Sequence, residues 1–359
     1  QALGLERAVV APAFPANGRT TRNGNLFVQG VLLEHTGFAR DPRNAISESH
    51  IPSLLARQAG EPVGLVDIAT VAQGPEAIRA AIAESASRLV VVDAESQRHL
   101  AHIAQAIVQA GLKWLPVGSA GLAEELPVAL GLATAAPASA PVSTDISPEY
   151  RGPVLVAAGS RNQITADQVS EAAAVLGLPI VEPDMERLVD RAAAQGEIDR
   201  LADEAARHLD RFGRCIVTTC FTALMEHRSA DIAVRLGRLT RQIIERRPVR
   251  GLFLTGGDIA LQACLALGAE ALRPIAEALP GLPVSLLVGG PWANMPVVTK
   301  AGGFGAKDAI WICVQYLEEK MTRSEHERER ETDSRHNHGR PGRLRAGDCG
   351  QIVSPEGDL

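Results

Sequence analysis

Short apolar runs alternate with longer amphipathic segments along most of the chain. The clearest runs, of strand length, are Leu89–Asp93, Pro153–Ala158 and Val249–Thr255. Each is followed by a segment with helical periodicity: Ser96–Gln109, Thr165–Leu176 and Ile259–Gly268. Strands that alternate with helices predict parallel sheets with helical crossovers. We therefore expect an α/β fold of two domains, each with a mostly parallel sheet flanked by helices, and a ligand cleft between them.

The β–α rhythm is interrupted once and ends before the C-terminus. Residues 134–148 are dominated by Ala, Pro, Ser and Thr and have no helical or strand period, which indicates a linker. This places one domain at 1–149 and a second at 150–320. Residues 321–359 are charged and almost free of apolar periodicity, so we expect a disordered tail.

Composition narrows the classes of partner. The 359 residues carry a net charge of −6 and only 3% aromatic residues, which argues against a nucleic-acid partner. No apolar run is long enough for a membrane span, so no membrane partner is expected. The five cysteines lack CxxC or metal-ligand spacing and indicate reduced thiols in a cytoplasmic protein.

Two glycine turns carry the candidate chemistry. Gly256-Gly257-Asp258 lies between a buried strand and an apolar helix, where backbone N–H groups and the helix N-terminus can hold a phosphate. A second turn, Lys300–Gly305, contains Gly302, Gly303 and Gly305. Neither GxxxxGK[ST] nor GxGxxG occurs. Asp258 is either a helix cap or a residue near Mg²⁺ or ribose, and Lys300 is either a cation for phosphate or a solvated lysine.

Five segments resemble motifs of the four-carbon acid sugar kinase family, which includes threonate, erythronate and oxo-tetronate kinases. They are PAFPANGRTT (Pro12–Thr21), GSAGLA (Gly118–Ala123), Ala158-Gly159-Ser160 with Thr165 and Gln168, and the two glycine turns. Thr165 and Gln168 also fit a capping box at a helix start. The resemblance implies a sugar-acid-binding domain at 1–149, an ATP-binding domain at 150–320, and phosphoryl transfer from ATP with Mg²⁺ to a sugar-acid hydroxyl.

The resemblance also suggests site residues. The nucleotide is expected at Ser160, Gly256, Gly257, Asp258, Ile259, Gly302, Gly303 and Gly305. The sugar acid is expected at Asn17, Gly18, Arg19, Ser119 and Gly121, with the arginine fork facing its carboxylate. The oligomeric state is left open between a monomer and a homo-oligomer.

One family feature is not found. Family members begin with a strand that carries an Asp-Asp pair and a Thr-Gly-Ala type turn, and no such segment occurs here. We therefore assign no catalytic base, and expect weak phosphorylation and an open sheet edge beside Val9–Ala11. Two alternatives stay open: a nucleotide-binding fragment without activity, and another α/β enzyme such as a dehydrogenase. Against the dehydrogenase, the acidic residue follows the glycines directly.

Overall fold

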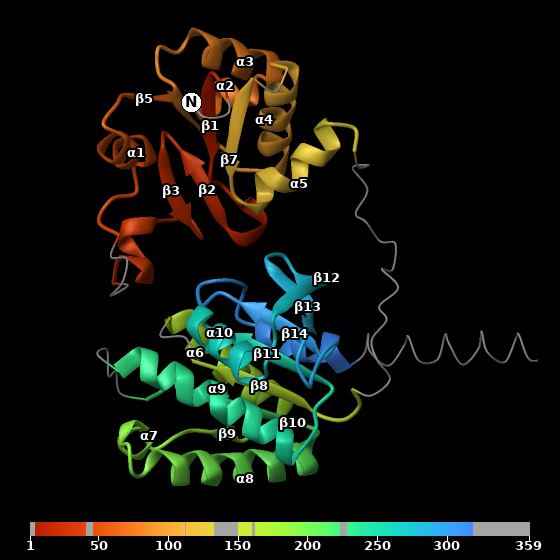
Figure 1. The fold of residues 1–359 in the computed structure, drawn as a ribbon. Coiled ribbons are helices and arrows are strands. Elements are labelled where there is room, and N and C mark those ends of the chain that lie inside the picture. The colour runs from red at the N-terminus through yellow and green to blue at the C-terminus, as the bar shows by residue number, and fades with distance from the viewer. Residues whose placement is uncertain are drawn as a thin grey trace, which may run out of the picture.

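The computed structural model describes residues 4–40, 46–111, 113–132, 150–159, 162–222 and 228–318. They form two lobes, each built around its own sheet (Figure 1). The predicted linker 134–148, the predicted tail 321–359 and Ser160 lie outside the described residues.

The first lobe is built on a four-stranded parallel sheet. Its strands, in spatial order, are β5 (Val63–Val66), β6 (Leu89–Val92), β1 (Arg7–Ala11) and β7 (Trp114–Gly118). Its helices are α1 (Ile51–Ala59), α2 (Ile68–Ala72), α3 (Pro75–Glu84), α4 (Gln97–Gln109) and α5 (Ala120–Ala129). The expectation of an open edge at Val9–Ala11 is wrong, because Val9 is paired with Val90 on one side and Pro116 on the other.

A small antiparallel sheet follows β1. It consists of β2 (Arg19–Arg22), β3 (Asn25–Val28) and β4 (Val31–Leu32), which confirms the predicted hairpin around Gly30. Single-turn 3-10 helices flank it at Pro15–Asn17, Leu33–His35 and Gly37–Arg40. The loop between β1 and β2 is therefore short, and it is held at one end by the four-stranded sheet and at the other by the small antiparallel sheet.

The second lobe is built on a seven-stranded sheet. Its spatial order is β12 (Ala271–Leu279), β13 (Leu282–Val288), β14 (Pro296–Lys300), β11 (Gly251–Thr255), β8 (Val154–Ala158), β10 (Arg214–Thr218) and β9 (Ile180–Val181). The five strands from β14 to β9 are parallel, whereas β12 and β13 form an antiparallel hairpin. The sequence pattern did not predict β12, since most of its first half is exposed and carries no strand alternation.

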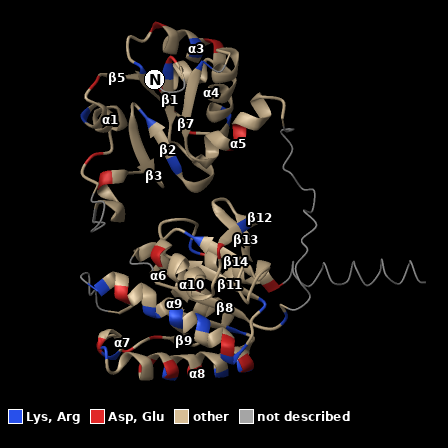
Figure 2. Cartoon of the chain, viewed as in Figure 1, with Lys and Arg blue, Asp and Glu red and all other residues tan. Residues whose placement is uncertain are grey.

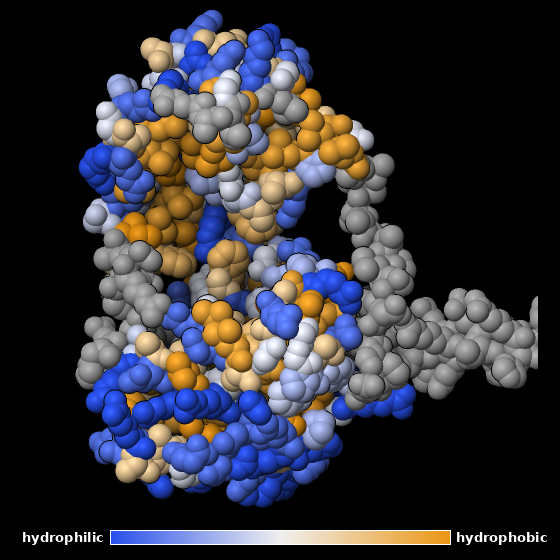
Figure 3. Space-filling model, in the orientation of Figure 1, coloured by the Kyte–Doolittle hydropathy of each residue, from blue (hydrophilic) through white to orange (hydrophobic). Residues whose placement is uncertain are grey.

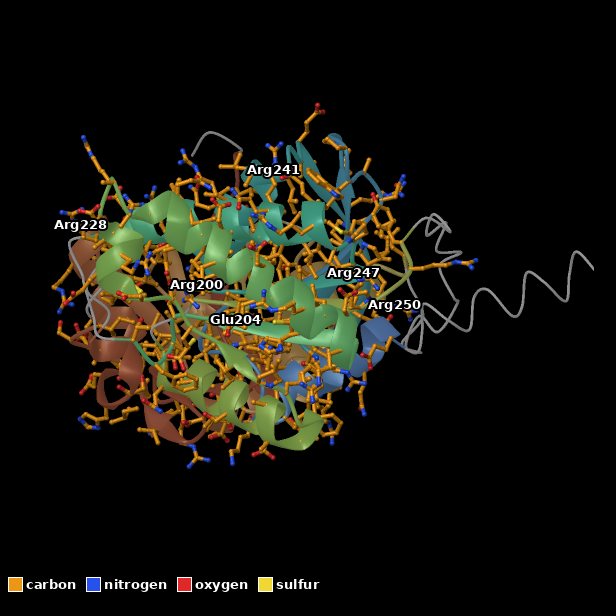
Figure 4. All side chains as sticks on the ribbon, turned by 90° about the horizontal axis from the view of Figure 1, so that it is seen from below. Arg200, Glu204, Arg228, Arg241, Arg247 and Arg250 are labelled. Atoms are coloured by element: carbon orange, nitrogen blue, oxygen red, sulfur yellow. The ribbon has the colours of Figure 1, made fainter. Side chains whose placement is uncertain are left out.

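Helices cover both faces of the larger sheet. Helix α6 (Gln163–Leu176) and the helix at 309–318 enclose one core, and α7 (Met185–Val189), α8 (Ala194–Phe212), α9 (Ser229–Arg246) and α10 (Gly257–Ala266) enclose the other. Acidic and basic residues are interspersed along α8, whereas the charged residues of α9 are mostly arginines (Figure 2). One ion pair, Arg200–Glu204 at 2.8 Å, lies on the exposed side of α8 (Figure 4).

This arrangement confirms the expected fold class of helix-flanked, mostly parallel sheets. Among the described helices, none combines the length and apolar character needed to cross a bilayer.

Candidate active site

The two lobes meet where the β12–β13 hairpin approaches the β1–β2 loop (Figure 1). The side-chain amide of Asn17 donates a hydrogen bond to the carbonyl oxygen of Pro280 over 2.9 Å. The neighbouring Gly281 has φ +78°, and a β-carbon there would collide with Asn17 and with the ring of Phe304. The contact therefore requires glycine at the hairpin turn. Beside it, the surface between the lobes is hollowed (Figure 3).

The Gly256 turn presents an open helix N-terminus. Gly256 has φ +95° and precedes the first turn of α10, where no side chain caps the helix. A β-carbon on Gly257 would meet nothing within 4 Å, so there is space over the first N–H groups. Such an end fits an anion, because its amides and the helix dipole both favour negative charge. Asp258 lies in the same turn.

Ile259 contributes to the core rather than to this opening. Its side chain is 4% exposed and packs so closely on Gly159 that a β-carbon there would collide with it. Ile259 was predicted to contact the nucleotide, but only its backbone, not its side chain, lies near the Gly256 turn.

The second glycine turn lies next to the first. Gly256 donates its amide to the carbonyl of Lys300 over 3.2 Å, and Thr255 of β11 pairs with Lys300 of β14. The structure therefore brings the two predicted nucleotide turns together at the carboxyl edge of one parallel sheet, where open α/β sheets bind ligands. We call residues 301–306 the glycine loop.

Lys300 anchors the glycine loop from within. It is 2% exposed, and its ammonium donates to the carbonyl oxygens of Ala301 (3.0 Å), Gly302 (3.1 Å) and Phe304 (3.2 Å). Burial lowers the pKa of Lys300 to about 8. The lysine is thus buried, and the interpretation as a solvated lysine is wrong, whereas a role as a cation for phosphate stays a prediction.

Thr165 and Gln168 hold the same loop from α6. The Thr165 hydroxyl donates to the Gly302 carbonyl (2.8 Å), and the Gln168 amide donates to the carbonyls of Phe304, Gly305 and Ala306. The capping-box interpretation is wrong, because the Asn162 side chain caps α6 instead. A polar pair on the otherwise apolar buried face of a helix is the sequence signal for this role.

Arg19 lies at the contact between the lobes. Its guanidinium carbon is 4.1 Å from the ring centre of Phe304 and 5.7 Å from that of Phe38. The side chain is half-buried, burial lowers its pKa, and within the described part of the chain it forms no ion pair. A partly desolvated arginine without a carboxylate partner fits a bound acid. Sequence reasoning did not identify either phenylalanine.

The other predicted acid-binding residues shape the β1–β2 loop. Gly18 has φ +65° and leaves room for Gln29. The Ser119 hydroxyl donates to the Ala13 carbonyl and also caps α5. Gly121 packs against Leu100, where a β-carbon would lie 2.8 Å away. Contact of these residues with a sugar acid stays a prediction.

Asp93 has a related structural role. It is buried at the end of β6 and accepts a hydrogen bond from the amide of Gly24 (3.0 Å), which fixes the β2–β3 turn. Burial raises the pKa of Asp93, although hydrogen bonds to the backbone oppose the shift.

Comparison with known families and proteins agrees with this geometry. Residues 1–126 match a family model described as a sugar-binding N-terminal domain, and residues 155–310 match a nucleotide-binding C-terminal domain. A D-threonate kinase of Salmonella typhimurium is 36% identical over an alignment of 328 residues that covers 87% of this chain and 74% of that protein.

Two further relatives have related names. A D-erythronate kinase of Heliobacterium modesticaldum is 29% identical, covering 88% of this chain and 74% of its own. A 3-oxo-tetronate kinase of Methylobacterium radiotolerans is 31% identical, in an alignment that covers 84% of this chain and 71% of that protein.

Solved structures share the fold. A Salmonella typhimurium protein aligns with a TM-score of 0.66 and 24% identity, over 88% of this chain and 74% of that one. A Haemophilus influenzae protein aligns with a TM-score of 0.57 and 24% identity, over the same shares of the two chains.

Proposed function

Because the chain belongs to the four-carbon acid sugar kinase family, we propose that it transfers the terminal phosphoryl group of ATP to a hydroxyl of a four-carbon sugar acid such as threonate or erythronate. The dehydrogenase alternative loses its support, since the relatives are kinases. The proposed reaction takes place between the lobes, in the hollow beside their contact (Figure 3).

One observation carries the proposal. Arg19 is half-buried and forms no ion pair among the described residues, and its guanidinium lies over the ring of Phe304 in the glycine loop of the nucleotide-binding lobe. A guanidinium fork recognises a carboxylate in two parallel hydrogen bonds. A sugar acid bound there would have its hydroxyl groups directed towards the neighbouring glycine turns, where the phosphates of ATP would lie.

The residues at the Gly256 turn fit a nucleotide and a magnesium ion. The space over Gly257 and the uncapped start of α10 suit phosphate oxygens. Mg²⁺ is held in kinases by one or two carboxylates together with phosphates and water, and Asp258 is the acidic residue of this turn. When bound, the ion would neutralise charge on the phosphates. Among the described residues, no group of three His, Cys, Asp or Glu side chains forms a separate metal site.

The chain's own residues contribute mainly by positioning. Phosphoryl transfer needs alignment of the hydroxyl with the phosphate and stabilisation of charge, more than covalent chemistry by the protein. In this proposal Arg19 fixes the acid, and the N–H groups at the start of α10 fix the phosphates. A cytoplasmic location, which suits the reduced cysteines, is part of the same proposal.

The test is a coupled assay of ADP release. The purified chain is incubated with Mg·ATP and, in turn, D-threonate, D-erythronate and 3-oxo-tetronate, with glycerate and acetate as controls. We expect turnover with at least one four-carbon acid and a phosphomonoester product by ³¹P NMR. The Arg19→Gln variant should raise KM for the acid by about 10- to 100-fold, since a charge-assisted hydrogen bond is lost. Binding of Mg·ADP without turnover on any acid would favour the nucleotide-binding fragment instead.

A further inference from the structure

The ring of Phe304 connects parts of both lobes. One face lies 4.1 Å from the guanidinium of Arg19 in the first lobe. Its edge lies against Gly281 in the β12–β13 hairpin, where a β-carbon would be only 2.9 Å from Cδ1. The ring is therefore enclosed between the hairpin backbone and the arginine.

The guanidinium carbon of Arg19 lies over the ring of Phe304, 4.1 Å from its centre. A guanidinium that stacks on an aromatic face keeps its N–H groups directed outward in its own plane, where they can meet an acceptor. The hydrogen bond described for these groups is a long one, 3.4 Å to the carbonyl of Asn17. In such an arrangement, the orientation of the ring would set the plane in which the remaining N–H groups meet an acceptor.

The position of Phe304 is itself fixed. Its carbonyl accepts hydrogen bonds from the Lys300 ammonium (3.2 Å) and the Gln168 amide (3.0 Å), both from buried side chains. Its amide donates to the carbonyl of Ala301 (3.1 Å). The glycine loop therefore presents the ring in a defined place, and the ring does not simply follow the arginine.

We propose that Phe304, although it belongs to the nucleotide-binding lobe, is a positioning residue for the sugar acid: its ring sets the plane of the Arg19 guanidinium that receives the acid's carboxylate. This inference rests on the proposed function, because it requires an acid at Arg19. It gives the glycine loop a role towards the acid as well as the role towards the nucleotide that the sequence predicts.

The test compares Phe304→Leu with Phe304→Tyr in the assay of ADP release. Leucine keeps an apolar side chain but removes the aromatic face, so KM for the sugar acid should rise about 3- to 30-fold, the range of a partly to fully desolvated cation–π contact. KM for ATP should change less than twofold. Tyrosine keeps the face and should restore KM for the acid to near the wild-type value.

A matched control is available on the surface. Arg211 lies 5.1 Å from the ring centre of Phe212 on α8, so Phe212→Leu removes the same kind of contact away from the site. It should leave both KM values unchanged. If the wild type is active and Phe304→Leu has the same KM for the acid as the wild type, the inference is overturned while the proposed function stands. No turnover and no acid binding by the wild type would overturn the proposed function and the inference with it.

Discussion

The ammonium of Lys300 and the hydroxyl of Thr165 donate to the same acceptor, the carbonyl oxygen of Gly302, over 3.1 and 2.8 Å. The two donors come from β14 and α6, and both elements precede the glycine loop in the sequence. Because both are buried, the loop has little freedom to move its carbonyl groups outward. Its conformation is set by the core of the lobe before any ligand binds.

Thr165→Val should loosen the glycine loop. The change keeps the shape of the side chain but removes the donor to Gly302, so the free energy of unfolding should fall by about 0.5–1.5 kcal/mol and KM for ATP should rise. Chemical denaturation and the assay of ADP release measure the two effects. Thr240→Val is the control, because the buried Thr240 donates within α9, to the carbonyl of Leu236 (2.9 Å). If KM for ATP rises equally in Thr240→Val, the role assigned to Thr165 in the glycine loop is contradicted.

Lys300 should give an unusual dependence of stability on pH. Its folded pKa of about 8 lies below the ordinary value of 10.5, so between these pH values the unfolded chain holds the proton more strongly. The contribution of this group to the free energy of unfolding should therefore increase as pH rises from 8 to 10.5. Urea denaturation gives the free energy of unfolding of the wild type and of Lys300→Met across this pH range, and the difference between the two isolates the contribution of Lys300. If that difference stays constant or falls as pH rises, a buried ammonium is contradicted.

Gly281→Ala should separate the lobes at their contact. The substitution places a β-carbon at φ +78° and against Asn17 and Phe304. We expect a loss of about 1–2 kcal/mol from backbone strain and, in addition, a higher KM for the sugar acid. Gly213→Ala has a similar φ of +71° but open space around it, so it should show the strain without the change in KM. Equal KM values in the two variants would show that the hairpin contact does not affect the acid site.

Gly257→Val should block the nucleotide. Its β-carbon would enter the open space over the start of α10, and its φ is not in the left-handed region, so folding should be retained. Mg·ADP at about 100 times its Kd should stabilise the wild type by about 2.7 kcal/mol, and this shift in melting should vanish in the variant. Gly196→Val, also in open space within a helix, is the control and should keep the shift. A full shift in Gly257→Val would place the phosphates elsewhere.

The sequence predicted the parts of the fold that follow from local patterns. The runs that become β6, β8 and β11 are apolar because they are buried on both faces, and their alternation with helices indicates parallel sheets. Strand β12 was missed because its exposed positions follow no such pattern. The two glycine turns were found because each directly follows a buried strand.

The site was predicted less completely. Thr165 and Gln168 were singled out, but a capping box uses the same residue types, and only the fold shows that their partners lie in the glycine loop. Arg19 was predicted as an acid ligand from its loop, whereas its stacking on Phe304 depends on how the lobes meet. No local pattern encodes contacts between such distant segments.

The hydrogen bond from Asn17 to Pro280 spans 263 positions in the chain. Contacts of such long sequence separation form late in folding, after the elements that carry them are in place. Each lobe has its own core, so each can fold as a unit before the hairpin meets the β1–β2 loop. The stacked arginine would thus be assembled in the last step of folding, and slow refolding would restore nucleotide binding earlier than binding of the acid.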